Sequence, residues 1–167
     1  MQNILSNQRS KVTFYSITLM ALTSVHHLYG AVIYHTPWRM HVLFLSIPVI
    51  IVTAILNRLL NQHTGGRWAL WLYWIVTLLA SVILIGVFEG IYNHILKNIL
   101  FFSGLPAGSM AKLYPQGTYE MPDNFFFEFT GMLQGIVAIP LVAWFIRLTR
   151  HAFGRQQQAT HKNNQAV

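Results

Sequence analysis

Residues 86–97 read Gly-Val-Phe-Glu-Gly-Ile-Tyr-Asn-His-Ile-Leu-Lys, and within this stretch a long apolar run turns polar. On a helix Glu89, Asn93 and Lys97 fall on one stripe, four residues apart, and His94 lies beside it. A carboxylate inside an apolar transmembrane segment is costly unless it faces a partner or water, so by default it indicates a functional site. The same physics allows a structural alternative, in which Glu89 pairs with a histidine and only holds the helices together.

The composition is that of a membrane protein. Of the 167 residues, 54% are hydrophobic and only 9% are charged, and the mean hydropathy is +0.45. A soluble domain carries about 25% charged residues. The net charge of +7 does not indicate nucleic-acid binding, because the basic residues are few and dispersed. The chain has no cysteine, which leaves histidine, carboxylate and methionine as the side chains that could bind a metal.

Four apolar segments predict an all-α membrane protein, a four-transmembrane-helix antiparallel bundle with one long extracytoplasmic loop. About 20 apolar residues are enough to cross a bilayer core of about 30 Å. We expect a single domain over residues 1–150 and a basic polar tail over residues 151–167, which should be disordered. The expected helices and the outer loop between the last two are, in order, 12–34, 37–60, 68–102, loop 103–123, and 125–149.

Local signals set the boundaries of these segments. Thr36 followed by Pro37 is typical of an N-cap and a first helical position, so the second helix should begin at once. The prolines and glycines of residues 103–123 indicate a loop. Gly131 and Gly135 form a small-xxx-small pair, which would allow another helix to approach closely.

The basic residues are distributed unevenly between the two ends of such a bundle. If the four helices alternate in direction, eight of the eleven Lys and Arg residues lie on the side of the chain termini. The positive-inside rule then predicts that both termini are cytoplasmic, in a bacterial inner membrane. The same alternation brings all four acidic residues and five of the eight histidines toward the outer face.

Candidates for one polar site near that face come from all four helices. They are His26, His27, Tyr34, His41, Glu89, Asn93, His94 and Glu128. His26 and His27 point about 100° apart, so only one of them should face a given partner helix. We expect one of these two histidines, Glu89 and His94 in a common cluster, with Glu128 at its rim.

Some of these residues also have plainer interpretations. His41 lies near the interface, where side chains with a polar tip settle among water and headgroups. Glu128, about one turn into the last helix, can stabilise the helix N-terminus. Asn93 can serve as a simple interhelical hydrogen-bonding residue.

Three classes of function remain open. The first is a site for a transition metal ion or one haem, with His27, His94 and Glu89 as metal ligands, because imidazole suits such ions and hydrogen-bonded carboxylates orient it. The second is a metal-free acid/base enzyme acting on a lipid-soluble substrate. The third is an accessory or assembly subunit that binds other membrane subunits. A transporter is disfavoured, because the sequence shows no polar path through the inner half of the bundle.

Overall fold

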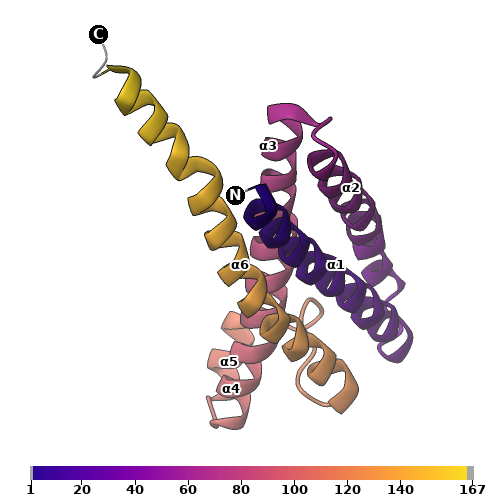
Figure 1. The fold of residues 1–167 in the computed structure, drawn as a ribbon. Coiled ribbons are helices and arrows are strands. Elements are labelled where there is room, and N and C mark those ends of the chain that lie inside the picture. Colours follow the sequence, from indigo (N-terminus) through magenta and orange to yellow (C-terminus); the bar gives the residue numbers. More distant parts are fainter. Residues whose placement is uncertain (1, 165–167) are drawn as a thin grey trace.

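The computed structural model describes residues 2–164, and the side chains of residues 3–152. Within residues 2–164 the secondary structure is entirely helical, so the predicted all-helical class is confirmed. Figure 1 shows the helices. In chain order they are α1 (Gln2–Ile33), η1 (Pro37–Val42), α2 (Leu43–Asn61), α3 (Gly66–Val76), η2 (Thr77–Leu96), α4 (Lys97–Phe102), α5 (Ala107–Leu113) and α6 (Phe125–Asn164).

Four helical stretches are long and apolar enough to cross a membrane. They cover Asn3–Ile33, Pro37–Asn61, Gly66–Phe102 and Phe125–Ala152. Each presents large apolar side chains on its outer surface, and Phe44 on α2 is 85% exposed. An extended exposed apolar surface of this kind suits contact with lipid rather than water. The chain therefore has the helix lengths and the surface of an integral membrane protein.

The third stretch is one continuous helix whose middle part, η2, is a π-helix. In a π-helix each N–H bonds the carbonyl five residues earlier rather than four, so the turn is wider. An α-helix has 3.6 residues per turn, so side chains four residues apart move gradually around its surface. On a wider helix, with more residues per turn, such side chains stay closer to one line. Residues at this interval are buried along the whole stretch: Tyr73, Thr77, Ser81, Ile85, Asn93 and Lys97.

The closest helix contact joins η2 to α6. A Cβ atom on Gly90 would collide with the backbone of Gly135, and one on Gly131 would collide with the imidazole of His94. The small-xxx-small pair of α6 therefore faces a glycine of η2, and the two backbones approach as closely as such pairs allow. This contact brings the first turns of α6 next to the polar end of η2.

Side-chain hydrogen bonds fix which ends lie together. Arg9 Nη2 donates to Asn61 Oδ1 over 2.6 Å and joins the start of α1 to the end of α2. Tyr34 OH donates to Asp123 Oδ1 over 2.6 Å and joins the end of α1 to the segment before α6. Partial burial and this hydrogen bond raise the pKa of the Tyr34 phenol, so it remains a donor. The end of the bundle where α1 ends and α6 begins is called the loop end below.

Thr36 stands at the N-cap position and Pro37 in the first turn of η1, as predicted, but the Thr36 side chain makes no capping hydrogen bond. The Thr36 N–H donates to Ala31 O over 3.0 Å, and its hydroxyl lies 3.4 Å from Gly30 O. Thr36 thus completes the end of α1, where His35 adopts a left-handed backbone with φ 52°. The Thr36 hydroxyl oxygen accepts from the side-chain Nε of Arg39 over 2.7 Å, and the second stretch starts as the 3₁₀ turn η1 before α2 begins at Leu43.

The loop and the tail hold more helix than predicted. Residues 107–113 of the expected loop form α5, and the buried Tyr114 that follows it donates its hydroxyl to Tyr92 O over 3.0 Å. The expected disordered tail 151–167 continues α6 as far as Asn164, and residues 165–167 lie outside the described residues. Gln, Ala, Arg and Lys are good helix formers and no proline interrupts them, so local propensity suffices to extend the helix.

Buried hydroxyl groups continue away from the loop end. Thr13 Oγ1 and Tyr73 OH are 2.9 Å apart, and Ser16 Oγ and Ser81 Oγ are 2.7 Å apart. The bundle therefore also holds buried polar pairs away from the loop end, because the four-residue interval turns Tyr73 and Ser81 toward α1. Such hydrogen bonds between helices are worth about 0.6 to 2 kcal/mol each in a membrane.

We predict that Gly90→Ala lowers the free energy of unfolding by at least about 2 kcal/mol, because the new methyl group would overpack the η2–α6 contact. Gly108→Ala is the matched control, since a Cβ atom there would have nothing of the described chain within 4 Å. Thermal unfolding of the detergent-solubilised variants measures both effects. Equal stability of the two variants would show that the close contact with Gly135 does not hold the bundle together.

Candidate metal centre

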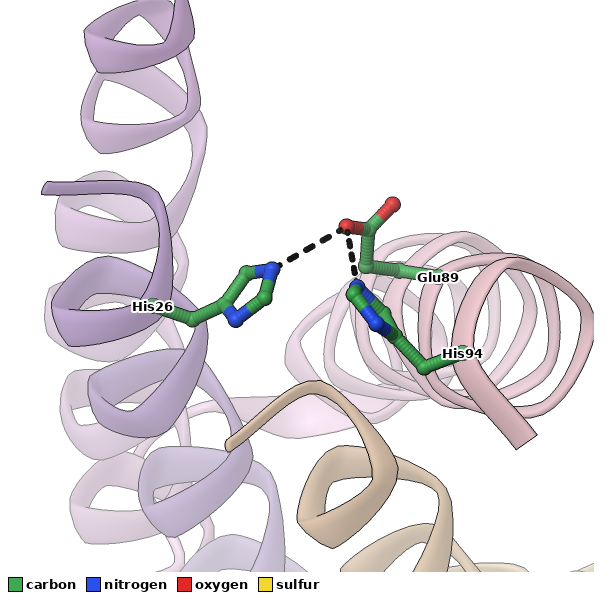
Figure 2. A group of neighbouring side chains, drawn as sticks. All are labelled: His26, Glu89 and His94. Atoms are coloured by element: carbon green, nitrogen blue, oxygen red, sulfur yellow. Dashed lines mark ion pairs between the residues drawn. The ribbon is translucent and has the colours of Figure 1, made fainter. Parts of the chain in front are cut away.

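A cluster of histidine and glutamate side chains lies at the loop end, where α1, η2 and α6 meet. Glu89 is at its centre: Oε1 lies 3.7 Å from His26 Nε2, 3.4 Å from His27 Nε2 and 3.6 Å from His94 Nε2. In Figure 2 the Glu89 carboxylate faces the imidazoles of both His26 and His94, which come from different helices. His26 and His94 are buried. The structure therefore gathers three of the candidate histidines around the carboxylate of Glu89.

Both members of the histidine doublet reach Glu89, so the expectation that only one of them would face a given partner helix is wrong. Their rings meet edge to face, with centroids 5.3 Å apart. Neighbouring positions on α1 diverge by about 100°, but the carboxylate of the facing helix reaches both rings. The tightest ligand set is His26, Glu89 and His94, whose ligand atoms all lie within 4.8 Å of one another. It contains His26 in place of the predicted His27.

The other ring nitrogens of His26 and His94 fix where their protons lie. The Thr130 hydroxyl donates to a main-chain carbonyl over 2.9 Å, so it accepts from His26 Nδ1 at 3.0 Å. The Glu128 carboxylate can only accept, so His94 Nδ1, 3.0 Å away, donates to it. A neutral imidazole carries one N–H. In the neutral rings both Nε2 atoms therefore bear lone pairs, and these point toward Glu89.

Three acceptor atoms thus face one another: Nε2 of His26, Nε2 of His94 and Oε1 of Glu89. The Nε2 atom of His26 is buried and has no hydrogen-bond partner among the described residues. Such a group is repulsive unless a cation lies between the atoms or one ring takes up a second proton. The separations of 3.6 and 3.7 Å from Oε1 are too long for a hydrogen bond. They are close to the roughly 3.4 Å between neighbouring ligands of a tetrahedral ion with bonds of about 2.1 Å. The cluster could therefore hold a metal ion.

The surrounding charges leave Glu89 without a fixed cation. Lys97 Nζ lies 2.8 Å from Glu128 Oε1, and Arg39 Nη2 lies 2.8 Å from Glu120 Oε1. The ion-pair partners of Glu89 within the described part of the chain are histidines alone. With neutral histidines, three carboxylates face two cations and the cluster carries one net negative charge. A divalent ion would change this to one net positive charge.

Hydrogen bonds hold the two glutamates in place. Asn93 Nδ2 donates to Glu89 Oε2 over 2.8 Å, which leaves Oε1 turned toward the histidines. Glu128 is only 4% exposed and accepts from Lys97, Asn98 and His94. It therefore lies inside the cluster, whereas the sequence analysis had placed it at the rim. A ligand set held by such a hydrogen-bonded shell keeps its geometry when an ion binds.

Several of these partners were missed by the sequence reasoning. Asn98 lies four residues after His94, so extending the polar stripe of residues 86–97 by one turn would have found it. Thr130 stands two residues after Glu128 in an apolar helix, a position with no distinctive signal. The Arg39–Glu120 pair joins η1 to the loop, and nothing in the spacing of these two residues links them.

Tyr34 and His41 lie apart from the centre of the cluster. Tyr34 is hydrogen-bonded to Asp123. His41 Nδ1 donates to Trp38 O over 2.6 Å, and the two rings stack with centroids 5.9 Å apart. Both residues therefore have local partners, and neither is a ligand atom of the His26, Glu89 and His94 set.

A cavity of about 340 Å³ adjoins the cluster. Its polar wall includes His27, Glu89 and His94, and His41 also lines it. Its other walls are apolar side chains of α2 and η2, and residues 118–120 of the loop close it at one side. A volume of this size suits a small organic ligand. The carboxylate of Glu89 is thus reachable from a space that is larger than a water molecule.

We predict that Lys97→Met destabilises the protein by about 3 to 5 kcal/mol, because Glu128 would remain buried as an uncompensated charge. The matched control is Lys112→Met on α5, where the lysine is exposed and the change should stay within about 0.5 kcal/mol. The Lys97→Met/Glu128→Gln double variant should recover part of the loss, since neither charge is then left alone. Chemical unfolding in detergent gives these differences, and a double variant as unstable as Lys97→Met would contradict the assignment.

The comparisons with known proteins add no relationship from which the chemistry of the cluster could be taken. Its interpretation rests on the contacts of His26, Glu89 and His94 themselves. No protein-family model, no curated protein and no solved structure matches this chain.

Proposed function

We propose that this is an integral membrane metal-binding protein, in which His26, His94 and Glu89 hold one divalent transition-metal ion. The observation that carries the proposal is the convergence of Nε2 of His26, Nε2 of His94 and Oε1 of Glu89, which are all acceptors when both histidines are neutral. The net negative charge of the buried cluster supports it as well, because a cation would be stabilised there. The plain alternative is a protonated His94 between two carboxylates, which would serve assembly of the helices alone.

The donor set limits the choice of ion. Two imidazole nitrogens and one carboxylate oxygen suit Zn²⁺ and Fe²⁺, and they suit the hard cations Ca²⁺ and Mg²⁺ less well. Sites with three protein ligands keep a position open for water or a substrate. His27 Nε2, 3.4 Å from Glu89 Oε1, is the nearest further nitrogen. We therefore favour a site with an accessible position over a closed structural one.

A compact ion fits the cluster better than a haem held between two histidines. The ring centroids of His26 and His94 are 4.6 Å apart, with the rings edge to face. Two axial imidazoles at about 2 Å from a shared iron would have their centroids roughly 6 Å apart, with a porphyrin between them. Of the two cofactors that the sequence left open, the metal ion is therefore the one we propose.

The hydrogen bonds behind the two histidines support the same proposal. Metal-bound histidines usually donate their second N–H to a carboxylate or another acceptor, which fixes the tautomer and the ring orientation. Glu128 accepts this bond from His94, and Thr130 accepts it from His26. A cluster that served assembly alone would not need both Nε2 atoms turned toward the same carboxylate.

We further propose that residues 1–150 form one antiparallel four-helix domain in a bacterial inner membrane, with both termini cytoplasmic and the loop end outside. The contacts of Arg9 with Asn61 and of Tyr34 with Asp123 support the alternation of the helices. Eight of the eleven basic residues lie in segments away from the loop end, which supports the orientation. The lipid bilayer is then the main partner, and the metal centre lies near the outer face.

We predict that the purified protein binds one Zn²⁺ or Co²⁺ ion per chain, measured by elemental analysis and by competition with a chelator. His26→Ala and His94→Ala should weaken retention by more than about 100-fold, and Glu128→Gln by about 10- to 100-fold, because the last change removes an orienting partner. Glu89→Gln should also weaken it. His41→Ala is the matched control and should have no effect, since His41 bonds only a local carbonyl.

A parent protein without stoichiometric metal would contradict this proposal. So would a loss of metal in His41→Ala as large as in His94→Ala. If His26→Ala and His94→Ala unfold the protein although the parent binds no metal, the assembly-subunit function becomes the better explanation.

The orientation is tested by reporter fusions. Alkaline phosphatase, active only outside the cytoplasm, should be active when inserted after Gly108 and inactive when fused after Val167. A cytoplasmically active reporter should give the opposite pattern. Phosphatase activity at the C-terminal fusion would place that terminus outside.

A further inference from the structure

We propose that the cavity beside the cluster takes up an amphiphile from the bilayer, a single-chain molecule with one anionic oxygen group, whose head binds at the metal. The inference rests on the proposed function in one respect, because the positive charge that attracts the head is that of the metal ion. It goes further by naming the chemical class of the ligand and the direction from which it enters.

The walls of the cavity divide into a polar and an apolar part. Glu89, His94 and His27 belong to the polar part, to which Arg39 and Lys97 also contribute. The apolar part includes Leu84, Ile85 and Phe88 of η2, together with Val42 and Leu45 on the opposite side. A ligand that fills this space must therefore have a polar end at the cluster and an apolar body away from it. Water alone would fill the cavity poorly, because most of its wall offers no hydrogen-bond partner.

The mouth of the cavity faces the bilayer. Leu84 and Phe88 line the cavity and are 42% and 44% exposed, and both lie within the membrane-spanning stretch Gly66–Phe102. In Figure 1, α2 runs close to α3 but spreads apart from η2 toward the loop end. Exposed side chains within a membrane span contact lipid. Leu45 of α2 and Leu84 and Phe88 of η2 line the cavity, so a molecule dissolved in the bilayer can reach the polar wall past these side chains.

The loop between α5 and α6 lines another part of the cavity. Thr118, Tyr119 and Glu120 line it there. Glu120 is held at both ends, because its carboxylate pairs with Arg39 and its carbonyl accepts from Lys97. These two contacts of Glu120 hold the loop between the cavity and the outer solution. Entry from the lipid is consequently the more open route.

Charge selects the head group. Arg39 and Lys97 line the cavity, but Glu120 and Glu128 already neutralise them. The metal-loaded cluster then has one net positive charge next to an apolar space. A monoanionic oxygen, such as a carboxylate, would neutralise it and occupy the open metal position. A cationic head would be repelled, and a neutral hydroxyl would leave the charge uncompensated.

The test uses Co²⁺-loaded protein in detergent, with the visible absorption of the bound Co²⁺ as the readout of its coordination. Laurate, acetate and dodecanol are titrated separately. We expect laurate to change the spectrum at a concentration at least about 100-fold lower than acetate, because each buried methylene group contributes roughly fourfold and burial of three or four of them is enough. Dodecanol, which has the chain but no charge, should have at most a weak effect.

Two variants locate the binding site. Leu84→Trp should fill the cavity and weaken the laurate response at least tenfold while Co²⁺ stays bound. Leu79→Trp is the matched control, because Leu79 is a 55% exposed leucine of η2 that does not line the cavity. The laurate response of Leu79→Trp should equal that of the parent protein.

The outcomes separate the two proposals. Failure of the parent protein to bind Co²⁺ overturns the proposed function. Bound Co²⁺ with equal responses to laurate and acetate overturns the apolar cavity, and equal responses to laurate and dodecanol overturn the selection of an anion. An unchanged laurate response in Leu84→Trp would show that the ligand binds elsewhere.

Discussion

The structure depends on one carboxylate that has no fixed counter-ion. Glu89 lies on a membrane-spanning helix, and the two nearby cations are taken by Glu120 and Glu128. The histidines of α1 and η2 are turned toward its Oε1 atom, and Asn93 holds its other oxygen. An isolated charge in an apolar interior is among the costliest groups a protein can contain. The helices therefore have to present polar partners at this depth, and a bound cation relieves the same cost.

The close contact of α6 with η2 makes this arrangement possible. Gly135 meets the backbone of Gly90, and Gly131 leaves the space that the His94 ring fills. With a larger residue at either position the first turns of α6 would stand further away, and Glu128 and Thr130 could not reach the two imidazoles. The same helix, α6, thus supplies both the glycines that allow the close contact and the polar residues that bond the imidazoles. Packing and chemistry cannot be varied independently here.

The sequence predicted the helical class, the four apolar stretches and a cluster of Glu89 and His94 with one histidine of the doublet, because apolar length and helix alternation determine depth. It could not predict which lone pairs face one another. That depends on a threonine hydroxyl on α6 and on the winding of η2, and neither leaves a recognisable pattern in the sequence. The buried serine pair of Ser16 and Ser81 was missed for the same reason, since the helix was taken as α-helical throughout.

The winding of η2 also makes this helix sensitive to its own length. Each residue turns an α-helix by about 100° and the wider π-helix by somewhat less, so one deleted residue between Ser81 and Glu89 would still rotate the carboxylate away from the histidines while Tyr73 and Ser81 kept their places. The polar contacts of Ser81 and Glu89 therefore fix the number of residues between these two positions. A change of length in the connection between α5 and α6 would meet no such restriction until it reached Glu120.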